Sequence, residues 1–434
     1  MRRMPPEILA DIFSWTLPSM DVRPRGFPDM ELSPWILTQV STRWRDISVF
    51  TPSLWCDISV AYGVYGGEGS KFPHPPMEMV RTQVERAGTQ NLRIQFYASE
   101  SHVPADQVAL FQFLASHSAR WEQLDIRLVA PLVPHLTELC GRLPALHRLS
   151  PSLVNVAIEY PPIQILFPAQ QLTAYRVQGP WETHYRVLKT APNIVEARII
   201  LFNYDDSDTV WSDPNHGLAE MVHLRRLYVS DIKILDYLRA PVLAEIVLDL
   251  CVEPDADPLE HLDPFLARSL CAPWRLCLTC APSAEITATI LNTHPFIISF
   301  GLVHTTHYGE DENSDLFFAT VNEHITMLTE SVDNSDCPLV APHLSEICFG
   351  SCAWMSIDYP LFLKMLESRR RAVDCALSAA AFLTEWGPLP DTATLAGMDE
   401  LRKGGLNLEV QCGAEAAYTV DHWNVHVCGV GYKS

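Results

Sequence analysis

The chain has 434 residues, of which 48% are hydrophobic and 19% are charged, so it can bury more core than one ordinary compact domain contains. Its 33 prolines outnumber its 19 glycines, a composition typical of many short elements separated by rigid turns. The 52 acidic and 31 basic residues give a net charge of -21, which disfavours nucleic acid and anionic membrane surfaces as partners.

The sequence predicts neither secretion nor a membrane span. Glu7 and Asp11 interrupt the first apolar stretch, which a secretory signal would not tolerate. The longest apolar run, residues 286–303, is broken by His294 and Pro295. The 12 cysteines have no regular framework and are typical of reduced, buried thiols. We therefore expect a cytoplasmic or nuclear protein.

The first sixty residues predict a small helical unit. Two prolines precede apolar residues at helical spacing, which predicts a first helix ending near Trp15. Ser33 and Pro34 provide an N-cap and a first-turn proline for a second helix that is expected to run to Thr51. Trp55 follows, and residues 57–60 alternate like a strand.

Three blocks in this region, residues 4–13, 40–47 and 51–55, follow the patterns L-P-x-E-I-L-x-x-I-F, V-C-x-x-W-R-x-I and P-x-L-W in that order. The segment therefore resembles the F-box family. Met4 stands where leucine is usual, Ser41 stands where cysteine is common, and the loop between the helices is longer. Because loop length is cheap to vary, these differences concern affinity more than identity.

The resemblance implies a three-helix unit that binds a Skp-type adaptor and, through it, a cullin-RING ubiquitin ligase. The residues that it places at the adaptor or its edge are Pro5, Pro6, Glu7, Ile8, Leu9, Ile12, Leu37, Val40 and Trp55, with Phe13 and Trp44 shared between the interface and the internal core. The alternative is that all of them are ordinary core residues of a helical cap.

A glycine-rich and proline-rich linker is expected over residues 61–75, followed by a repeated phrase over residues 76–412. The phrase reads leucine, two variable residues, apolar, variable, apolar. Between its middle apolar residues the first three gaps are 22, 30 and 19 residues, close to the roughly 20–29 of leucine-rich repeats. The middle residues that can be aligned are Tyr175, Ala197, Leu227, Ile246 and Ile347.

The predicted fold class is α/β, with the three-helix F-box-like unit over residues 1–60 followed by an irregular leucine-rich-repeat solenoid. A parallel sheet is expected on its concave side, residues 398–410 are expected to form the last helix and strand, and residues 413–434 form a tail. An unrelated α/β domain with a parallel sheet is the main rival, although it would not require one phrase to recur.

Between Leu276 and Leu363 the chain has no lysine or arginine. Four acidic residues in the middle of this stretch form a candidate site for a basic segment of a target protein: Glu310, Asp311, Glu312 and Asp315. The simpler alternative is a solvated surface that keeps the protein soluble.

No phosphate-binding, nucleophile-elbow or metalloprotease motif occurs, so we expect a chain that is not an enzyme and has no cofactor. Cys277 and Cys280 lack a second pair at zinc-binding spacing. A weak cluster near the end of the chain offers four donors, and His304 with His307 could bind a metal only weakly. We assign no metal site to any of them; the four donors are Cys412, His422, His426 and Cys428.

The leading hypothesis is a substrate-recognition subunit of a Skp-cullin-F-box ubiquitin ligase, in which the repeats bind an unidentified target protein. The alternatives are a repeat-based interaction scaffold without a ligase and, more remotely, a metal-dependent enzyme centred on the histidines.

Overall fold

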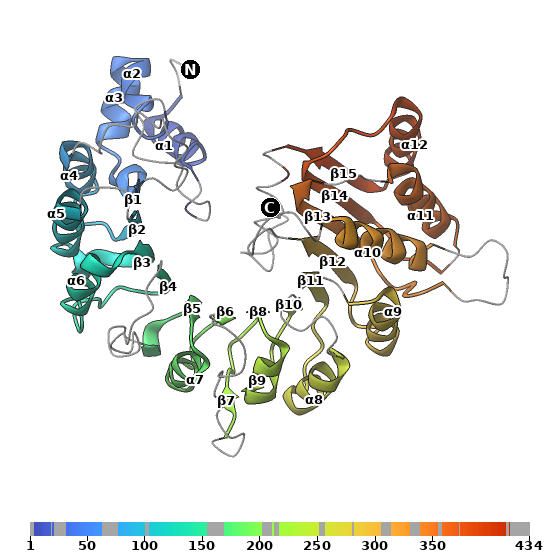
Figure 1. Ribbon diagram of the computed structural model, residues 1–434. Coiled ribbons are helices and arrows are strands. Elements are labelled where there is room, and N and C mark those ends of the chain that lie inside the picture. Colours follow the sequence, from blue (N-terminus) through green and yellow to red (C-terminus); the bar gives the residue numbers. More distant parts are fainter. Residues whose placement is uncertain are drawn as a thin grey trace. The chain divides into compact units, whose positions relative to one another are not determined.

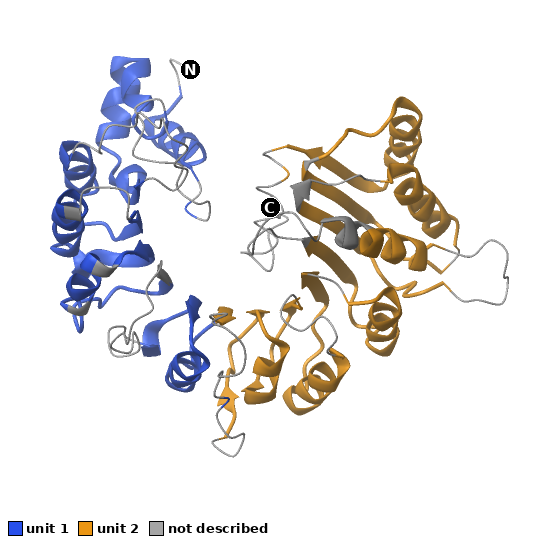
Figure 2. Ribbon diagram, in the orientation of Figure 1, with its two compact units in different colours: residues 1–194, 202–211 blue, residues 195–201, 212–434 orange. Residues whose placement is uncertain are grey.

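The structure, a computed structural model, describes residues 4–18, 20, 32–62, 77–99, 104–153, 169–201, 211, 217–250, 257–279, 282–304, 314–329, 339–354, 358–372, 374–413 and 416. Within them the chain is α/β, with a parallel sheet of 13 strands that is not closed. The chain divides into two compact units (Figure 2). Unit 1 comprises residues 1–194 and 202–211, and unit 2 comprises residues 195–201 and 212–434.

Unit 1 begins with helices and continues with alternating strands and helices (Figure 1). Its strands are parallel neighbours in the order β1-β2-β3-β4-β5. Its elements are α1 (Pro6–Ser14), α2 (Leu37–Val40), α3 (Thr42–Val49), η1 (Pro52–Trp55), β1 (Asp57–Ala61), α4 (Met77–Arg86), β2 (Leu92–Tyr97), α5 (Pro104–Ala115), η2 (Ser118–Arg120), β3 (Trp121–Leu128), η3 (Ala130–Leu132), α6 (Val133–Thr137), β4 (Arg148–Leu153), η5 (Ala169–Gln171), β5 (Ala174–Gly179) and α7 (Trp181–Thr190).

Unit 2 repeats a strand followed by a helix, and its main strands are parallel in the order β6-β8-β10-β11-β12-β13-β14-β15. A separate pair is formed by β7 (Ala219–Glu220) and β9 (Leu238–Arg239). The other elements are β6 (Glu196–Leu201), β8 (Arg226–Val229), η7 (Ile232–Tyr237), β10 (Glu245–Asp249), α8 (Leu259–Ser269), β11 (Arg275–Thr279), α9 (Ala284–Thr293), β12 (Ser299–His304), α10 (Ser314–Met327), β13 (Glu346–Trp354), α11 (Tyr359–Arg371), β14 (Ala379–Trp386), α12 (Thr392–Lys403) and β15 (Asn407–Cys412).

In both units the helix-facing side of the 13-stranded sheet is built from the apolar positions of the repeated phrase. In unit 2 the Phe349 ring lies 6.1 Å from that of Phe362 in α11, and the Phe382 ring lies 5.2 Å from the same ring. In unit 1 the rings of Phe96 and Phe111 are 5.3 Å apart. The middle residues predicted from the phrase are all buried: Tyr175, Ala197, Leu227, Ile246 and Ile347.

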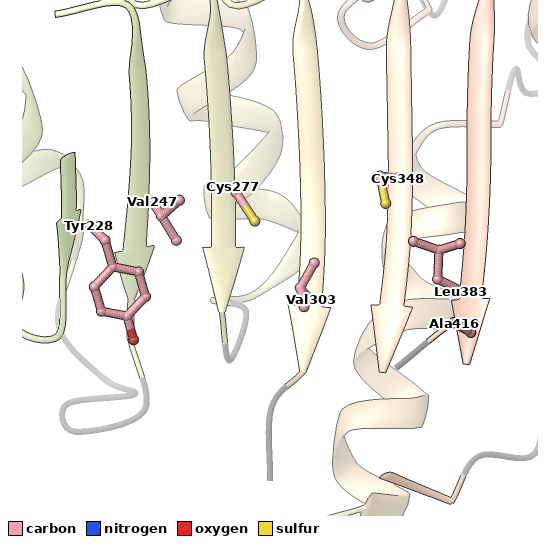
Figure 3. Packing of buried hydrophobic residues seen from close by; sticks show 7 residues of the cluster. All are labelled: Tyr228, Val247, Cys277, Val303, Cys348, Leu383 and Ala416. Carbon is pink, nitrogen blue, oxygen red and sulfur yellow. The ribbon is translucent and has the colours of Figure 1, made fainter. Parts of the chain in front are cut away.

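The opposite face of the unit 2 sheet is also buried along its middle strands, a feature that the alternating pattern did not predict. Every residue of β10 and β11 is buried, whichever face its side chain is on. Figure 3 shows a row of apolar side chains that crosses these strands and those beside them. Its members are Tyr228, Val247, Cys277, Val303, Cys348, Leu383 and, from beyond the last strand, Ala416.

The predicted single helix between Ser33 and Thr51 is wrong, because the chain breaks it into α2 and α3. Ser41 between them is extended, with φ -161° and ψ 164°, and its hydroxyl accepts a hydrogen bond from the Trp44 amide at 3.2 Å. A serine at this position therefore caps a new helix instead of continuing the old one.

The structure tests only some of the predicted domain boundaries. Residue 60 falls inside β1, which already pairs with β2. Most of the linker predicted over residues 61–75 lies outside the described residues, as does the tail after Cys412 apart from Gly413 and Ala416. The predicted last helix and strand correspond to α12 and β15, and β15 pairs with β14.

Candidate partner-binding surface

The N-terminal helices enclose a small aromatic core. Phe13 of α1 contacts Trp44 of α3, with ring centroids 4.7 Å apart. Trp55 is fully buried, its ring meets that of Trp35 edge-on at 5.0 Å, and its Nε1 donates a hydrogen bond to the Ser48 carbonyl at 2.7 Å. Because aromatic pairs and a satisfied indole N–H stabilise a core, these contacts hold the three helices together.

Helix α4 joins this core to the sheet of unit 1. The Arg86 guanidinium lies over Trp55 at 4.3 Å and over Trp35 at 5.2 Å, and burial lowers its pKa. Gln83 donates from Nε2 to the Asp57 carbonyl at 2.5 Å, at the start of β1. The helices thus have a fixed attachment, which favours a preorganised surface over a loose segment.

The helices are also fixed to one another by polar contacts. Arg43 donates to the Met4 carbonyl ahead of α1, and Arg45 donates from Nε to the Thr38 carbonyl of α2 at 2.7 Å. The hydroxyls of Thr16 and Ser33 are 2.7 Å apart. Any partner that binds these helices meets a surface whose backbone is already positioned.

The eleven residues that the resemblance placed at an adaptor divide by burial. Pro5, Pro6, Glu7, Ile8 and Val40 are exposed. The partly buried side chains are Ile12 and Trp44, and the buried ones are Leu9, Phe13, Leu37 and Trp55. The four buried side chains belong to the core beneath the helical surface, whereas the five exposed residues are accessible to a partner.

Three exposed apolar side chains on this segment were missed from the sequence. Trp15 is 83% exposed, Phe50 is 82% exposed and Leu32 is 53% exposed, beside Ile8 at 47% and Val40 at 54%. The described residues contain 12 large hydrophobic side chains with such exposure, and these five lie within residues 8–50. Several exposed large apolar side chains in one small unit make that unit a candidate for a partner-binding surface.

Helical geometry places two of these side chains on one face of α1. Ile8 and Trp15 are seven residues apart, about two turns, and the partly buried Ile12 lies between them. Trp15 caps the C-terminal end of the helix, and Phe50 has the same place on α3. In the sequence, an aromatic residue follows the apolar stripe of each helix. Such a residue could equally well belong to the core, so the sequence alone did not predict its exposure.

The acidic residues predicted to bind a target lie mostly outside the described residues. Glu310, Asp311 and Glu312 lie outside the described residues, and Asp315 belongs to α10, where the position of its side chain is not described. Their role stays a prediction.

The described residues contain no group of three histidine, cysteine or acidic side chains arranged for a metal ion. Cys280, His307, His422, His426 and Cys428 lie outside them. Burial raises the pKa of Cys277 to about 12 and that of Cys56 to about 11, so both thiols are protonated near neutral pH and are poor nucleophiles.

A second pattern missed from the sequence is a row of alternating charges at the first position of successive strands. In unit 2, Glu196, Arg226, Glu245 and Arg275 are paired in register. Arg226 lies 2.7 Å from Glu196 and 3.6 Å from Glu245. Farther along, Arg275 donates to Glu346 at 2.9 Å. If two neighbouring strands exchanged places, residues of like charge would lie side by side. This charge row therefore favours the observed strand order.

No family model matches the chain, and no curated protein matches its sequence. Among the helices that the structure describes, none combines the length and the apolar character required to cross a bilayer.

Proposed function

We propose that the chain is the substrate-recognition subunit of a Skp-cullin-F-box type ubiquitin ligase. In this proposal residues 1–60 form the F-box-like unit that docks a Skp-type adaptor, and the repeats form a leucine-rich-repeat solenoid that holds a target protein. The chain brings the target close to the ligase, and other subunits transfer ubiquitin in the cytoplasm or the nucleus.

The observation that supports the proposal best is the set of five exposed apolar side chains within residues 8–50, on helices α1 to α3 and in the segments beside them. Fully burying one large apolar side chain contributes about 1.5–3 kcal/mol. Five such side chains together approach the association cost, on the order of 4–15 kcal/mol. The contact residues under this proposal are Ile8, Trp15, Leu32, Val40 and Phe50, with Pro5, Pro6 and Glu7 at the edge.

The test is capture of a purified Skp-type adaptor by the full-length chain. Ile8→Asp combined with Trp15→Ala changes only exposed side chains, so the fold should survive and capture should fall by at least about tenfold. Leu389→Asp is the matched control, because Leu389 is an exposed apolar residue of unit 2. Absence of capture by the wild-type chain, or equal capture by the double variant, contradicts the proposal.

A further inference from the structure

Unit 2 contains a pocket of about 500 Å³ that is separate from the N-terminal helices. Its lining comes from the turns before three neighbouring strands and from the first residues of two of them, so it lies at the N-terminal edge of the parallel sheet. We call it the valine–arginine pocket; it is lined by Val195, Glu196, Val222, His223, Arg225, Arg226 and Val242.

The backbone frame of the pocket is tightly connected. The amides of Arg225 and Arg226 donate to the Val195 carbonyl at 2.8 and 3.2 Å, and the amides of Ala244 and Glu245 donate to the Arg225 carbonyl at 2.9 and 3.0 Å. These bonds hold the three turns at fixed spacing. A ligand would therefore meet a formed site, which reduces the ordering cost of binding.

The pocket has one cation that is neutralised and one that is not. Arg226 lies 2.7 Å from Glu196 and is also close to Glu245. The exposed side chain of Arg225 has no hydrogen-bond or ion-pair partner among the described residues, and neither has that of His223. The spare donors therefore favour an anionic group, although the chain as a whole is strongly acidic.

Arg225 differs in charge from the residues that replace it along the sheet. From β8 to β14, the residue just before each main strand donates its backbone amide to the carbonyl of the corresponding residue before the neighbouring strand. These bonds link equivalent positions in the order Val195, Arg225, Ala244, Trp274, Ile298, Ser345 and Ser378. Arg225 is the one charged residue in this series. Beside it, Val222 and Val242 are large hydrophobic side chains that remain exposed.

We propose that the valine–arginine pocket binds a short peptide segment of the target in which an acidic side chain stands next to a branched apolar one. The carboxylate accepts hydrogen bonds from Arg225, with His223 beside it, and the apolar side chain lies against Val222 and Val242. The inference rests on the proposed function, in which the repeats hold the target, and it adds the chemistry of the segment that is recognised.

The test uses a fluorescein-labelled hexapeptide of alternating glutamate and valine, and a matched peptide with lysine in place of glutamate. Fluorescence anisotropy with the full-length chain at about 0.15 M salt measures both, a condition at which screening limits long-range attraction between exposed charges. The wild-type chain should prefer the acidic peptide. Arg225→Glu should weaken its binding by at least about tenfold, the scale of one charge-assisted hydrogen bond.

Ser345→Glu is the matched control, since Ser345 has the equivalent place in the strand series away from the pocket, and it should leave binding unchanged. Preference for the lysine peptide, no binding of the acidic peptide, or equal loss in the two variants overturns the inference. Displacement of the acidic peptide by millimolar acetate indicates a site for small anions only and overturns it too.

Adaptor capture is measured separately on the wild-type chain and on the Arg225→Glu protein, which should capture the adaptor equally. A wild-type chain that captures the adaptor but does not bind the acidic peptide contradicts this inference alone. A wild-type chain that binds the acidic peptide but not the adaptor contradicts the proposed function and leaves the pocket assigned.

Discussion

The N-terminal helices of unit 1 and the sheet of unit 2 treat their apolar residues in opposite ways. The helices bury a few aromatics and leave Trp15 and Phe50 almost fully exposed, whereas β10 and β11 bury every residue on both faces. The sheet also pairs its charges in register at the strand ends. A surface that stays open to a partner and a core that closes on itself therefore occur in the same chain, and substitutions can separate the two.

The largest effect is expected inside the helical core. Trp55→Ala removes a fully buried indole, its hydrogen bond to Ser48 and the platform under Arg86. The free energy of unfolding should fall by about 3–5 kcal/mol, as measured by chemical denaturation. A loss below about 1 kcal/mol would mean that the helices are not held by this core.

The charge row should be nearly as sensitive. Arg275→Met nearly keeps the volume but removes the guanidinium that donates to Glu346 and Ser299, so stability should fall by about 1.5–3 kcal/mol, the scale of a hydrogen bond to a charged group. The matched control is Arg371→Met, which breaks an exposed pair with Glu367 and should cost less than about 1 kcal/mol. Equal losses of unfolding free energy in the two variants would show that the charge row stabilises the sheet no more than an exposed ion pair does.

A smaller effect is expected from pH. His324 of α10 is buried, its Nε2 lies 2.9 Å from the Thr287 hydroxyl of α9 and its Nδ1 lies 2.7 Å from the Thr320 carbonyl. Burial lowers its pKa below the ordinary 6.5. Above pH 6.5 the His324 imidazole is neutral in both the folded and the unfolded chain. Its contribution to the free energy of unfolding is therefore fully present there.

As the pH falls below 6.5, the unfolded chain binds a proton that the folded chain resists, so stability is lost toward the folded-state pKa. His324→Gln should be less stable at pH 7.5 but should lose less stability between pH 6.5 and 5, in denaturation series at each pH. Parallel pH profiles for the two proteins would show that another group controls the slope.

The smallest stability effect belongs to the exposed surface. Trp15→Ala should change the free energy of unfolding by no more than about 0.5 kcal/mol, because the indole is already in water. The same variant should weaken adaptor binding, measured by titration calorimetry. A large loss of stability would show that Trp15 belongs to the core and not to the docking surface.

Much of the strand pattern could be predicted from the sequence because apolar periodicity survives locally. The phrases around Leu227, Ile246 and Ile347 became β8, β10 and β13, with those residues buried as predicted. The break at Ser41 was harder, because a serine inside an apolar stripe reads as helix until its hydroxyl is seen to cap the next turn.

The candidate surface was predicted only in part. Spacing placed Leu9 and Ile8 on one helix but could not decide which of them faces water, since that depends on where α3 packs. The partners of Glu245 and Arg275 depend on strand register, which joins residues far apart in the chain. The valine–arginine pocket likewise arises from turns that meet only in the folded sheet.

Amide hydrogen exchange of the full-length chain, with and without a purified Skp-type adaptor, shows whether the adaptor binds the N-terminal helices and not the sheet of unit 2. We expect added protection within α1, α2 and α3 and unchanged exchange in β10 and β11. Protection confined to unit 2, or no change anywhere at saturating adaptor, would contradict this expectation.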